Sequence, residues 1–344
     1  MTNRKFSVKF WVQNSALSVF SLIFILAFGE WLFPKYLNKI PFRLYGGLET
    51  KLRVLAQYSK QSLLPQNYIA LIGDSNSVGV RDLYIDSSKS FLNWYPNYSP
   101  AHFNNKKVGI DVIPFGFAGA GSLDGIWSGP INQFRHINAR GFDLKPPKTI
   151  LVLFYEGNDL SNSLQFIREN YEGGEDIEEL LQSDKFNQRL NHQFQKSIDE
   201  TDSGLETNFL FTKFLINSVK KNLEKSKKEE GFQHIIFPAK PITQAIVNGK
   251  MAPLPVHLQA PPTFRFSLFD KNKGHVEERS KVGYYIFERA TKKMKGIFPE
   301  SDINIFYLPS VLSTYKIVSS VASFRANMGK GGIVDTKKLF QRHL

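Results

Sequence analysis

The sequence contains no cysteine among its 344 residues. Disulfides, thiolate metal sites, a cysteine nucleophile and a lipidated N-terminal cysteine are therefore excluded. Charged residues make up 22% and hydrophobic residues 42% of the chain, a balance that excludes wholesale disorder and a polytopic membrane protein. Acidic residues are in deficit, with 31 against 44 lysines and arginines, so the formal net charge is +13. This excess favours an anionic partner surface, whether phospholipid, acidic glycan or nucleic acid.

A long apolar stretch occupies residues 16–33 near the N-terminus. Its uncharged core, residues 16–28, has the length of a signal peptide and is short for a spanning helix of about 20 residues. The side chains that follow form an aromatic and basic belt typical of a membrane interface, which lengthens the effective span: Trp31, Phe33, Lys35 and Tyr36. We favour an uncleaved signal anchor over a cleaved signal peptide, for which Ala27-Phe28-Gly29 would be the cleavage site, and over an amphipathic or buried helix.

Basic residues flank this stretch on both sides and therefore do not fix its orientation: Arg4, Lys5 and Lys9 before it, and Lys35, Lys39 and Arg43 after it. The short N-terminal tail favours a cytoplasmic N-terminus with the rest of the chain exported. We expect residues 1–40 to form a signal anchor and juxtamembrane segment, and the remainder to face the periplasm or cell envelope.

Four apolar runs have the character of β-strands: residues 68–72, 108–117, 149–155 and 303–308. Each run closes with glycine, asparagine, aspartate or serine, or with proline followed by serine. Because the carboxyl ends of parallel strands lie at one edge of a sheet, these closures should converge there. The pattern predicts an α/β domain over residues 60–344, with a flavodoxin-like, doubly wound parallel sheet.

The segment between the third and fourth runs is far longer than a single crossover helix requires. Residues 164–230 are charged and helix-prone, and residues 231–267 are rich in proline and aromatic side chains. The amphipathic pattern of residues 277–297 predicts the crossover helix. We expect residues 160–265 to form a helical and loop insertion over the active edge, as a cap or a partner surface. Its clustered lysines have a solvated helix face as their simplest interpretation: Lys220, Lys221, Lys225, Lys227 and Lys228.

The polar residues at the ends of the strands suggest serine chemistry. Serine is a weak nucleophile unless a base removes its proton and hydrogen-bond donors stabilise the oxyanion. Ser75 follows the first strand at a turn into a helix, where its hydroxyl can face solvent and the helix N-terminus offers positive potential. Gly119 can present an unobstructed backbone N–H, and Asn158 can aim an amide N–H from the end of the third strand. These three residues form the candidate catalytic site.

This combination resembles the SGNH, or GDSL-like, hydrolase family. The family's first block is matched by Gly73-Asp74-Ser75, with the serine as nucleophile. The resemblance implies that Gly119, from the second block, and Asn158, from Asn158-Asp159 of the third block, complete the oxyanion hole. It covers residues 68–160 and 302–310.

Two departures from the family pattern affect the chemistry. The third block usually opens with glycine, where this chain has Glu156, which would crowd the oxyanion hole, bind substrate or point away. The last block, Asp-x-x-His, supplies the general base and its supporting aspartate, and it does not occur anywhere in the sequence. The only candidate bases are His343, which Asp335 precedes by eight residues, and His257 in the insertion. For each, an exposed or structural role is the simpler interpretation.

The end of the sequence bears on the same question. A flavodoxin-like hydrolase sheet has a fifth strand, whereas residues 314–326 and 335–344 have helical character. Without a fifth strand the fourth would be an apolar edge, which soluble proteins avoid. We expect either that the natural chain continues to a base-bearing loop or that the domain is a non-catalytic relative. On its own, the present sequence should be prone to aggregate, and it should be catalytically weak unless a histidine within it is the base.

The resulting hypothesis is a membrane-anchored serine esterase or O-acyltransferase that acts through an acyl-Ser75 intermediate. Family habit and export favour O-acyl, chiefly O-acetyl, groups of an envelope polysaccharide as the substrate. The competing hypothesis is an inactive binding or assembly protein of the envelope, which the missing base favours. Only the net positive charge favours nucleic-acid binding, and this function conflicts with the membrane anchor. No cofactor or metal is expected.

Overall fold

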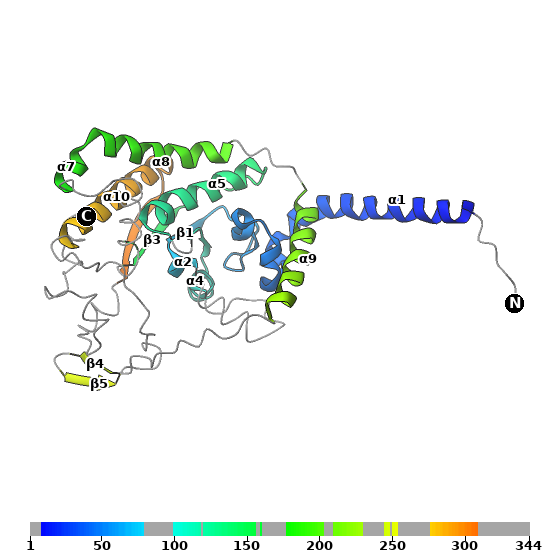
Figure 1. Ribbon diagram of the computed structural model, residues 1–344, viewed down its shortest axis with the longest axis horizontal. Helices are drawn as coiled ribbons and strands as arrows, with labels where there is room; N and C mark the ends of the chain where they lie inside the picture. Colours follow the sequence, from blue (N-terminus) through cyan, green and yellow to red (C-terminus); the bar gives the residue numbers. More distant parts are fainter. Residues whose placement is uncertain are drawn as a thin grey trace.

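The computed structural model describes residues 8–78, 99–117, 120–155, 159, 177–202, 209–229, 244–247, 250–253 and 276–308. Within these residues, four parallel strands form one sheet flanked by helices, and an apolar helix projects from the N-terminal side (Figure 1). The α/β class and the apolar N-terminal helix that the sequence predicts are confirmed.

The sheet contains β1 (Tyr68–Gly73), β2 (Asp111–Pro114), β3 (Thr149–Tyr155) and β6 (Asp302–Leu308). Their spatial order is β2-β1-β3-β6, and each neighbouring pair is parallel. After β1 the chain forms β2 along one edge of β1. It then returns to form β3 along the other edge of β1, and β6 next to β3. The strand order reverses between β1 and β3, which makes their carboxyl ends the topological switch point.

Strand β2 is shorter than the apolar run 108–117 suggests. Residue Val108 ends helix α4 (Pro100–Val108), and Gly109 caps that helix in the left-handed conformation with φ of 70°. At the other end, the missing N–H of Pro114 does not interrupt the pairing, because the backbone N–H groups of Phe115 and Phe117 still donate to the carbonyls of Leu71 and Gly73 in β1. The helix cap thus sets where the strand begins, and hydrogen bonds to β1 continue beyond its four residues.

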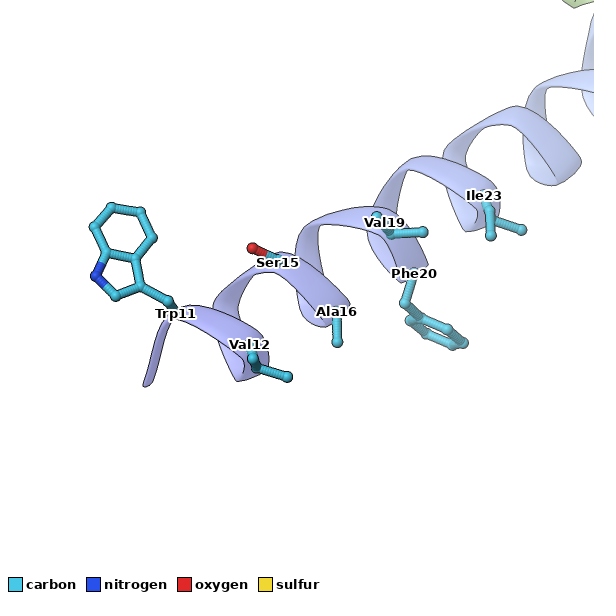
Figure 2. A pocket seen from close by; sticks show the side chains of 7 residues that line it. All are labelled: Trp11, Val12, Ser15, Ala16, Val19, Phe20 and Ile23. Atoms are coloured by element: carbon cyan, nitrogen blue, oxygen red, sulfur yellow. The ribbon is translucent and has the colours of Figure 1, made fainter. Parts of the chain in front are cut away.

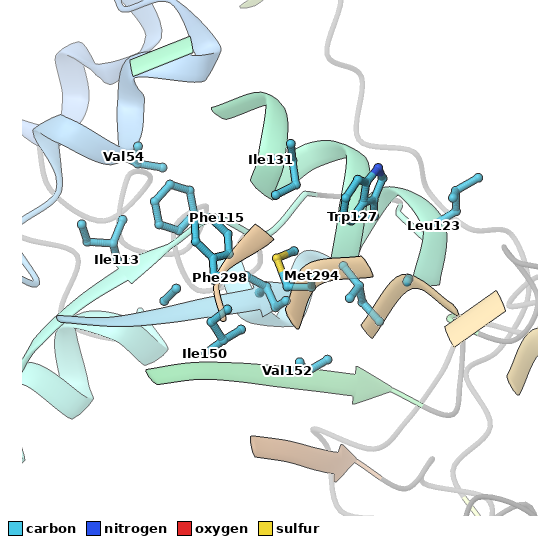
Figure 3. Packing of buried hydrophobic residues seen from close by; sticks show 14 of the residues in the cluster. Val54, Ile113, Phe115, Leu123, Trp127, Ile131, Ile150, Val152, Met294 and Phe298 are labelled. Carbon is cyan, nitrogen blue, oxygen red and sulfur yellow. The ribbon is translucent and has the colours of Figure 1, made fainter. Parts of the chain in front are cut away.

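The two faces of the sheet bury different sets of side chains. One face packs against α5 (Gly129–Ala139), the π-helix η4 (Ser122–Ser128) and α10 (Val276–Ile297), and it holds most of the core (Figure 3). Its buried side chains include Ile113, Trp127, Ile150, Val152, Met294 and Phe298. On the opposite face, Ala101 of α4 packs with Leu71 and Val112. Strand β1 is thus buried on both sides, whereas β3 is buried on the side of the main core and half-buried on the other.

The segment between β3 and β6 contributes to the main core as well as forming a separate hairpin. Helices α7 (Ile177–Gln182) and α8 (Asp184–Asp202) place Leu180, Phe186, Leu190 and Phe194 in the same buried cluster as the sheet. The short strands β4 (Gln244–Val247) and β5 (Lys250–Pro253) pair antiparallel with each other, apart from the main sheet. Helices α7 and α8 of the predicted insertion are therefore a layer of the α/β domain.

The chain after the N-terminal helix also folds into the domain. Three 3₁₀ helices follow it in close succession: η1 (Phe33–Lys39), η2 (Phe42–Gly47) and η3 (Thr50–Ala56). Leu37, Leu52 and Leu55 are fully or almost fully buried in the main core. The connection between the apolar helix and the sheet is consequently packed against the domain.

Helix α1 (Val8–Leu32) is longer than the uncharged core of the sequence suggests. Its 25 residues rise about 37 Å at 1.5 Å per residue, enough to cross the roughly 30 Å hydrocarbon core of a bilayer. Among the described residues, one helical segment, Trp11–Lys39, is long and apolar enough to span a membrane, a test that a signal sequence also passes. Figure 2 shows a shallow apolar groove along its surface, lined by Trp11, Val12, Ser15, Ala16, Val19, Phe20 and Ile23.

The close approach of β1 and β3 depends on Gly73, which ends β1 with φ of +137°. A Cβ at this position would lie 2.5 Å from the carbonyl oxygen of Leu153 in β3. We expect Gly73→Ala to lower the free energy of unfolding by about 2–4 kcal/mol, since it adds a clash to backbone strain. The matched control is Gly141→Ala, because Gly141 has φ of +81° but a Cβ there would meet no heavy atom within 4 Å. If thermal denaturation shows equal losses of stability for the two variants, the close contact between β1 and β3 does not contribute to the effect of Gly73→Ala.

Candidate active site

Ser75 lies where β1 gives way to helix α2 (Ser75–Val78), at the carboxyl edge of the sheet. The preceding residue, Asp74, fixes this turn. Its carboxylate accepts hydrogen bonds from the backbone N–H of Asn76 at 2.8 Å and from the Asn76 side-chain amide at 3.0 Å. Its carbonyl oxygen accepts the Ser77 hydroxyl at 2.7 Å. Asp74 thus acts as the N-cap of α2 and holds Ser75 as the first helical residue.

The loop after β2 folds onto the same edge. The backbone N–H of Phe117 donates to the carbonyl of Gly73 at 3.0 Å, so the two chain segments stay together beyond the end of the ladder. A Cβ at Gly116 would overlap the side chain of Ser77, so only glycine permits this approach. Ala120 is buried. Gly119 itself lies outside the described residues, and its predicted oxyanion role stays a prediction.

The end of β3 forms the third part of the edge. The Asp159 carboxylate accepts the backbone N–H of Tyr155, the last residue of β3, at 2.6 Å. This bond ties Asp159 to the end of β3. The predicted site residue Asn158 and its neighbour Glu156 lie outside the described part of the chain, so their roles remain predictions.

Two buried carboxyl groups, Asp74 and Asp159, follow the two strands that meet at the switch point. Their exposed fractions are 1% and 3%, respectively. Burial, and then the negative charge of Asp74, raise the pKa of Asp159 well above its usual range, while the N–H of Tyr155 acts in the opposite direction. Two carboxyl groups that interact in this way favour retention of a proton by one of them. The edge beside Ser75 therefore has an acid pair at its base.

Sequence patterns alone assign no role to this pair, although both residues belong to the matched blocks. The signal that could have found the pair is their position relative to the strands, because Asp74 directly follows β1 and Asp159 comes four residues after the end of β3. Adjacent parallel strands bring such residues together at one edge.

The raised pKa of Asp159 predicts how stability changes with pH. A carboxyl group whose pKa is higher in the folded state contributes stability below its unfolded pKa, about 3.9, and loses that contribution as pH rises toward the folded pKa. Asp159→Asn retains an oxygen that can accept the Tyr155 N–H but cannot ionise. We expect its melting temperature to exceed that of the unaltered protein by a margin that grows as pH rises above about 4.

The control for this pH dependence is Asp143→Asn, since Asp143 is an exposed partner of Lys145. It should shift the melting temperature little, because exposed ion pairs contribute about 0–1 kcal/mol. A margin for Asp159→Asn that stays constant from acidic to neutral pH would contradict the assignment of a raised pKa.

None of the three described histidines replaces the missing Asp-x-x-His block. His136 Nε2 lies 2.7 Å from Glu49, whose other carboxylate oxygen lies 3.0 Å from Arg140. The hydrogen bond from His136 is the main cause that lowers the pKa of Glu49. On α4, His102 Nδ1 lies 3.4 Å from the carbonyl oxygen of Tyr58, and His192 is exposed on α8. The predicted candidates His343 and His257 lie outside the described residues.

Comparisons with protein-family models, with curated proteins and with solved structures find no match to this chain. The SGNH resemblance therefore rests on the residues and their placement. Within the described residues, no group of three or more histidine, aspartate or glutamate side chains could hold a metal ion.

Proposed function

We propose that this protein is a membrane-anchored serine hydrolase of the SGNH type, with a doubly wound sheet. The observation that carries the proposal is the position of Ser75, the first residue of a helix that leaves a buried central strand at the switch point. The strand order β2-β1-β3-β6 supports it, because it corresponds to the first four positions of the flavodoxin-like order.

In the proposed reaction, the Ser75 hydroxyl attacks the carbonyl carbon of an ester while a general base removes its proton. The backbone N–H of Gly119 and the amide of Asn158 stabilise the oxyanion of the tetrahedral intermediate. Collapse of the intermediate releases the alcohol, which takes up the proton, and leaves an acyl-Ser75 ester. Water then hydrolyses this ester, or a second alcohol accepts the acyl group. His343 and His257 are the proposed candidates for the base, in that order.

The proposed substrate is an O-acetylated polysaccharide of the cell envelope. The spanning-length helix α1 supports a site held next to a membrane, where envelope glycans are assembled or displayed. An ester, rather than an amide, matches the limited activation available to Ser75, since alkoxide leaving groups depart more readily than amines.

A second candidate function is glycan binding or envelope assembly without catalysis. The observation that favours it is the lack of an Asp-x-x-His block in the sequence. Both candidates require the same fold and the same anchor, so only a chemical assay separates them.

To test the proposed function, the full chain in detergent micelles is incubated with an O-acetylated polysaccharide and released acetate is measured. We expect release that Ser75→Ala abolishes and that Ser62→Ala, a change at an exposed serine, leaves intact. Retention of the polysaccharide on immobilised protein without any acetate release would contradict catalysis and support the binding protein.

A further inference from the structure

The helix α9 (Leu210–Glu229) is attached to the end of α1. The Glu30 carboxylate, in the last turn of α1, accepts the backbone N–H of Phe211 at 2.9 Å and of Thr212 at 2.8 Å. These are first-turn N–H groups, which have no carbonyl partner within their own helix. Figure 1 shows α9 running crosswise over the base of α1, where the long helix leaves the domain. A carboxylate from one helix therefore caps the other.

Aromatic packing fixes which side of α9 faces α1. The ring of Phe33 lies 5.5 Å from that of Phe211 and 4.7 Å from that of Phe214, measured between centroids. A Cβ at Gly29 would overlap the Phe211 ring, so the two helices are in close contact there. The side of α9 that carries Phe211 and Phe214 is thus occupied by the N-terminal part of the chain.

The other side of α9 exposes large apolar side chains. Ile216 and Val219 are 60% and 58% exposed, and Leu215 is 37% exposed. Phe209, which immediately precedes the helix, is 58% exposed. Their spacing of three, four and seven residues places them on one face. A single exposed apolar side chain is ordinary, whereas a stripe of them on one helix indicates a binding surface.

The charge of α9 identifies the surface that it fits. The helix contains six lysines and two glutamates, so its own charge is strongly positive. An apolar stripe combined with lysines is typical of helices that lie in the interface of a membrane with anionic lipids. At the end of α1, Lys35 Nζ lies 3.6 Å from the ring centroid of the exposed Trp31. Aromatic and basic side chains of this kind are typical of the membrane interface, so the end of α1 also indicates the level of the interface.

We propose that α9 lies in the interface of a membrane that contains anionic phospholipids, with Phe209, Leu215, Ile216 and Val219 inserted among the lipids and with the net positive charge of the helix attracted to the headgroups. The proposal rests on the membrane-spanning role of α1. Because Glu30 and the Phe33 ring tie α9 to α1, the two helices together hold the domain in a fixed orientation over the bilayer.

The absence of cysteine permits a direct test with single-cysteine variants of the full chain. Ile216→Cys and Val219→Cys are labelled with a polarity-sensitive fluorophore and reconstituted in vesicles of phosphatidylcholine and phosphatidylglycerol. Phe24→Cys reports on the exposed surface of α1, and Phe103→Cys reports on an exposed apolar position of α4. Quenching by spin-labelled lipid is compared with quenching by aqueous iodide.

We expect lipid quenching at positions 216 and 219 to exceed that at position 103 several-fold, with iodide quenching in the reverse order. Vesicles of phosphatidylcholine alone should reduce lipid quenching at 216 but not at 24. Equal quenching at 216 and 103 would overturn the proposal. Protection of 216 from both quenchers would overturn it too, since it indicates a protein partner. Unquenched label at position 24 would instead refute the anchor, which separates the two failures.

Discussion

Replacing Ser75 by alanine is expected to reduce hydrolysis of a simple aryl acetate by at least about 1,000-fold, because a serine hydrolase without its nucleophile retains only binding and oxyanion stabilisation. The loss should appear in kcat, with little change in KM. The fold should persist, since Asp74 makes the hydrogen bonds that close the turn and alanine is compatible with the first position of α2.

The control for Ser75→Ala is Ser62→Ala, which changes an exposed serine outside the strand ends. Both variants should melt at nearly the same temperature as the unaltered protein. Hydrolysis that survives Ser75→Ala within about threefold would place the nucleophile elsewhere, since loss of a covalent nucleophile has much larger effects.

Replacing Asn158 by alanine should slow the same reaction about 100- to 1,000-fold, the usual effect of removing one oxyanion donor. The physical reason is that the amide N–H is needed most when negative charge develops on the substrate oxygen. Binding of the uncharged ester should change little, so the loss should again lie in kcat.

Asn104→Ala offers a matched control for this measurement, because Asn104 is exposed on α4. It should leave turnover unchanged. A decrease below about threefold for Asn158→Ala would remove Asn158 from the oxyanion hole and leave Gly119 as the single proposed donor.

The strands of the sheet were predictable because each is a short apolar run that ends at turn residues. The structure has all four runs as parallel strands, with β3 and β6 at or within one residue of the predicted bounds. The limits of β2 were less accessible, since the strand begins only after a helix cap at Gly109 and its hydrogen bonds to β1 continue past Pro114 through Phe115 and Phe117. Neither of these features can be predicted from the apolar composition of the run alone.

The organisation around the apolar helix was not predictable from local patterns. Residues 33–56 contain few continuous apolar runs, yet Leu37, Leu52 and Leu55 enter the main core. The cap that Glu30 provides to α9 joins it to residues that lie 181 and 182 positions further along the chain. Contacts of this kind arise from tertiary packing and leave no periodic signal in the sequence.

For the candidate site, the sequence placed Ser75 at the end of β1, and this position is the one the structure has. It did not reveal the interaction between Asp74 and Asp159, because their closeness follows from the pairing of β1 with β3. The roles of Gly119 and Asn158 stay predictions, since both residues lie outside the described part of the chain.

The most direct test of an acyl-Ser75 mechanism is covalent labelling of the full chain with a fluorophosphonate, followed by peptide mapping by mass spectrometry. The reagent reacts with a serine that has been activated for nucleophilic attack. We predict one labelled peptide, the one that contains Ser75, with no label on the Ser75→Ala protein and full label on the Ser62→Ala protein. Undiminished labelling of Ser75→Ala, or a label mapped to a different serine, would contradict the assignment of Ser75 as the nucleophile.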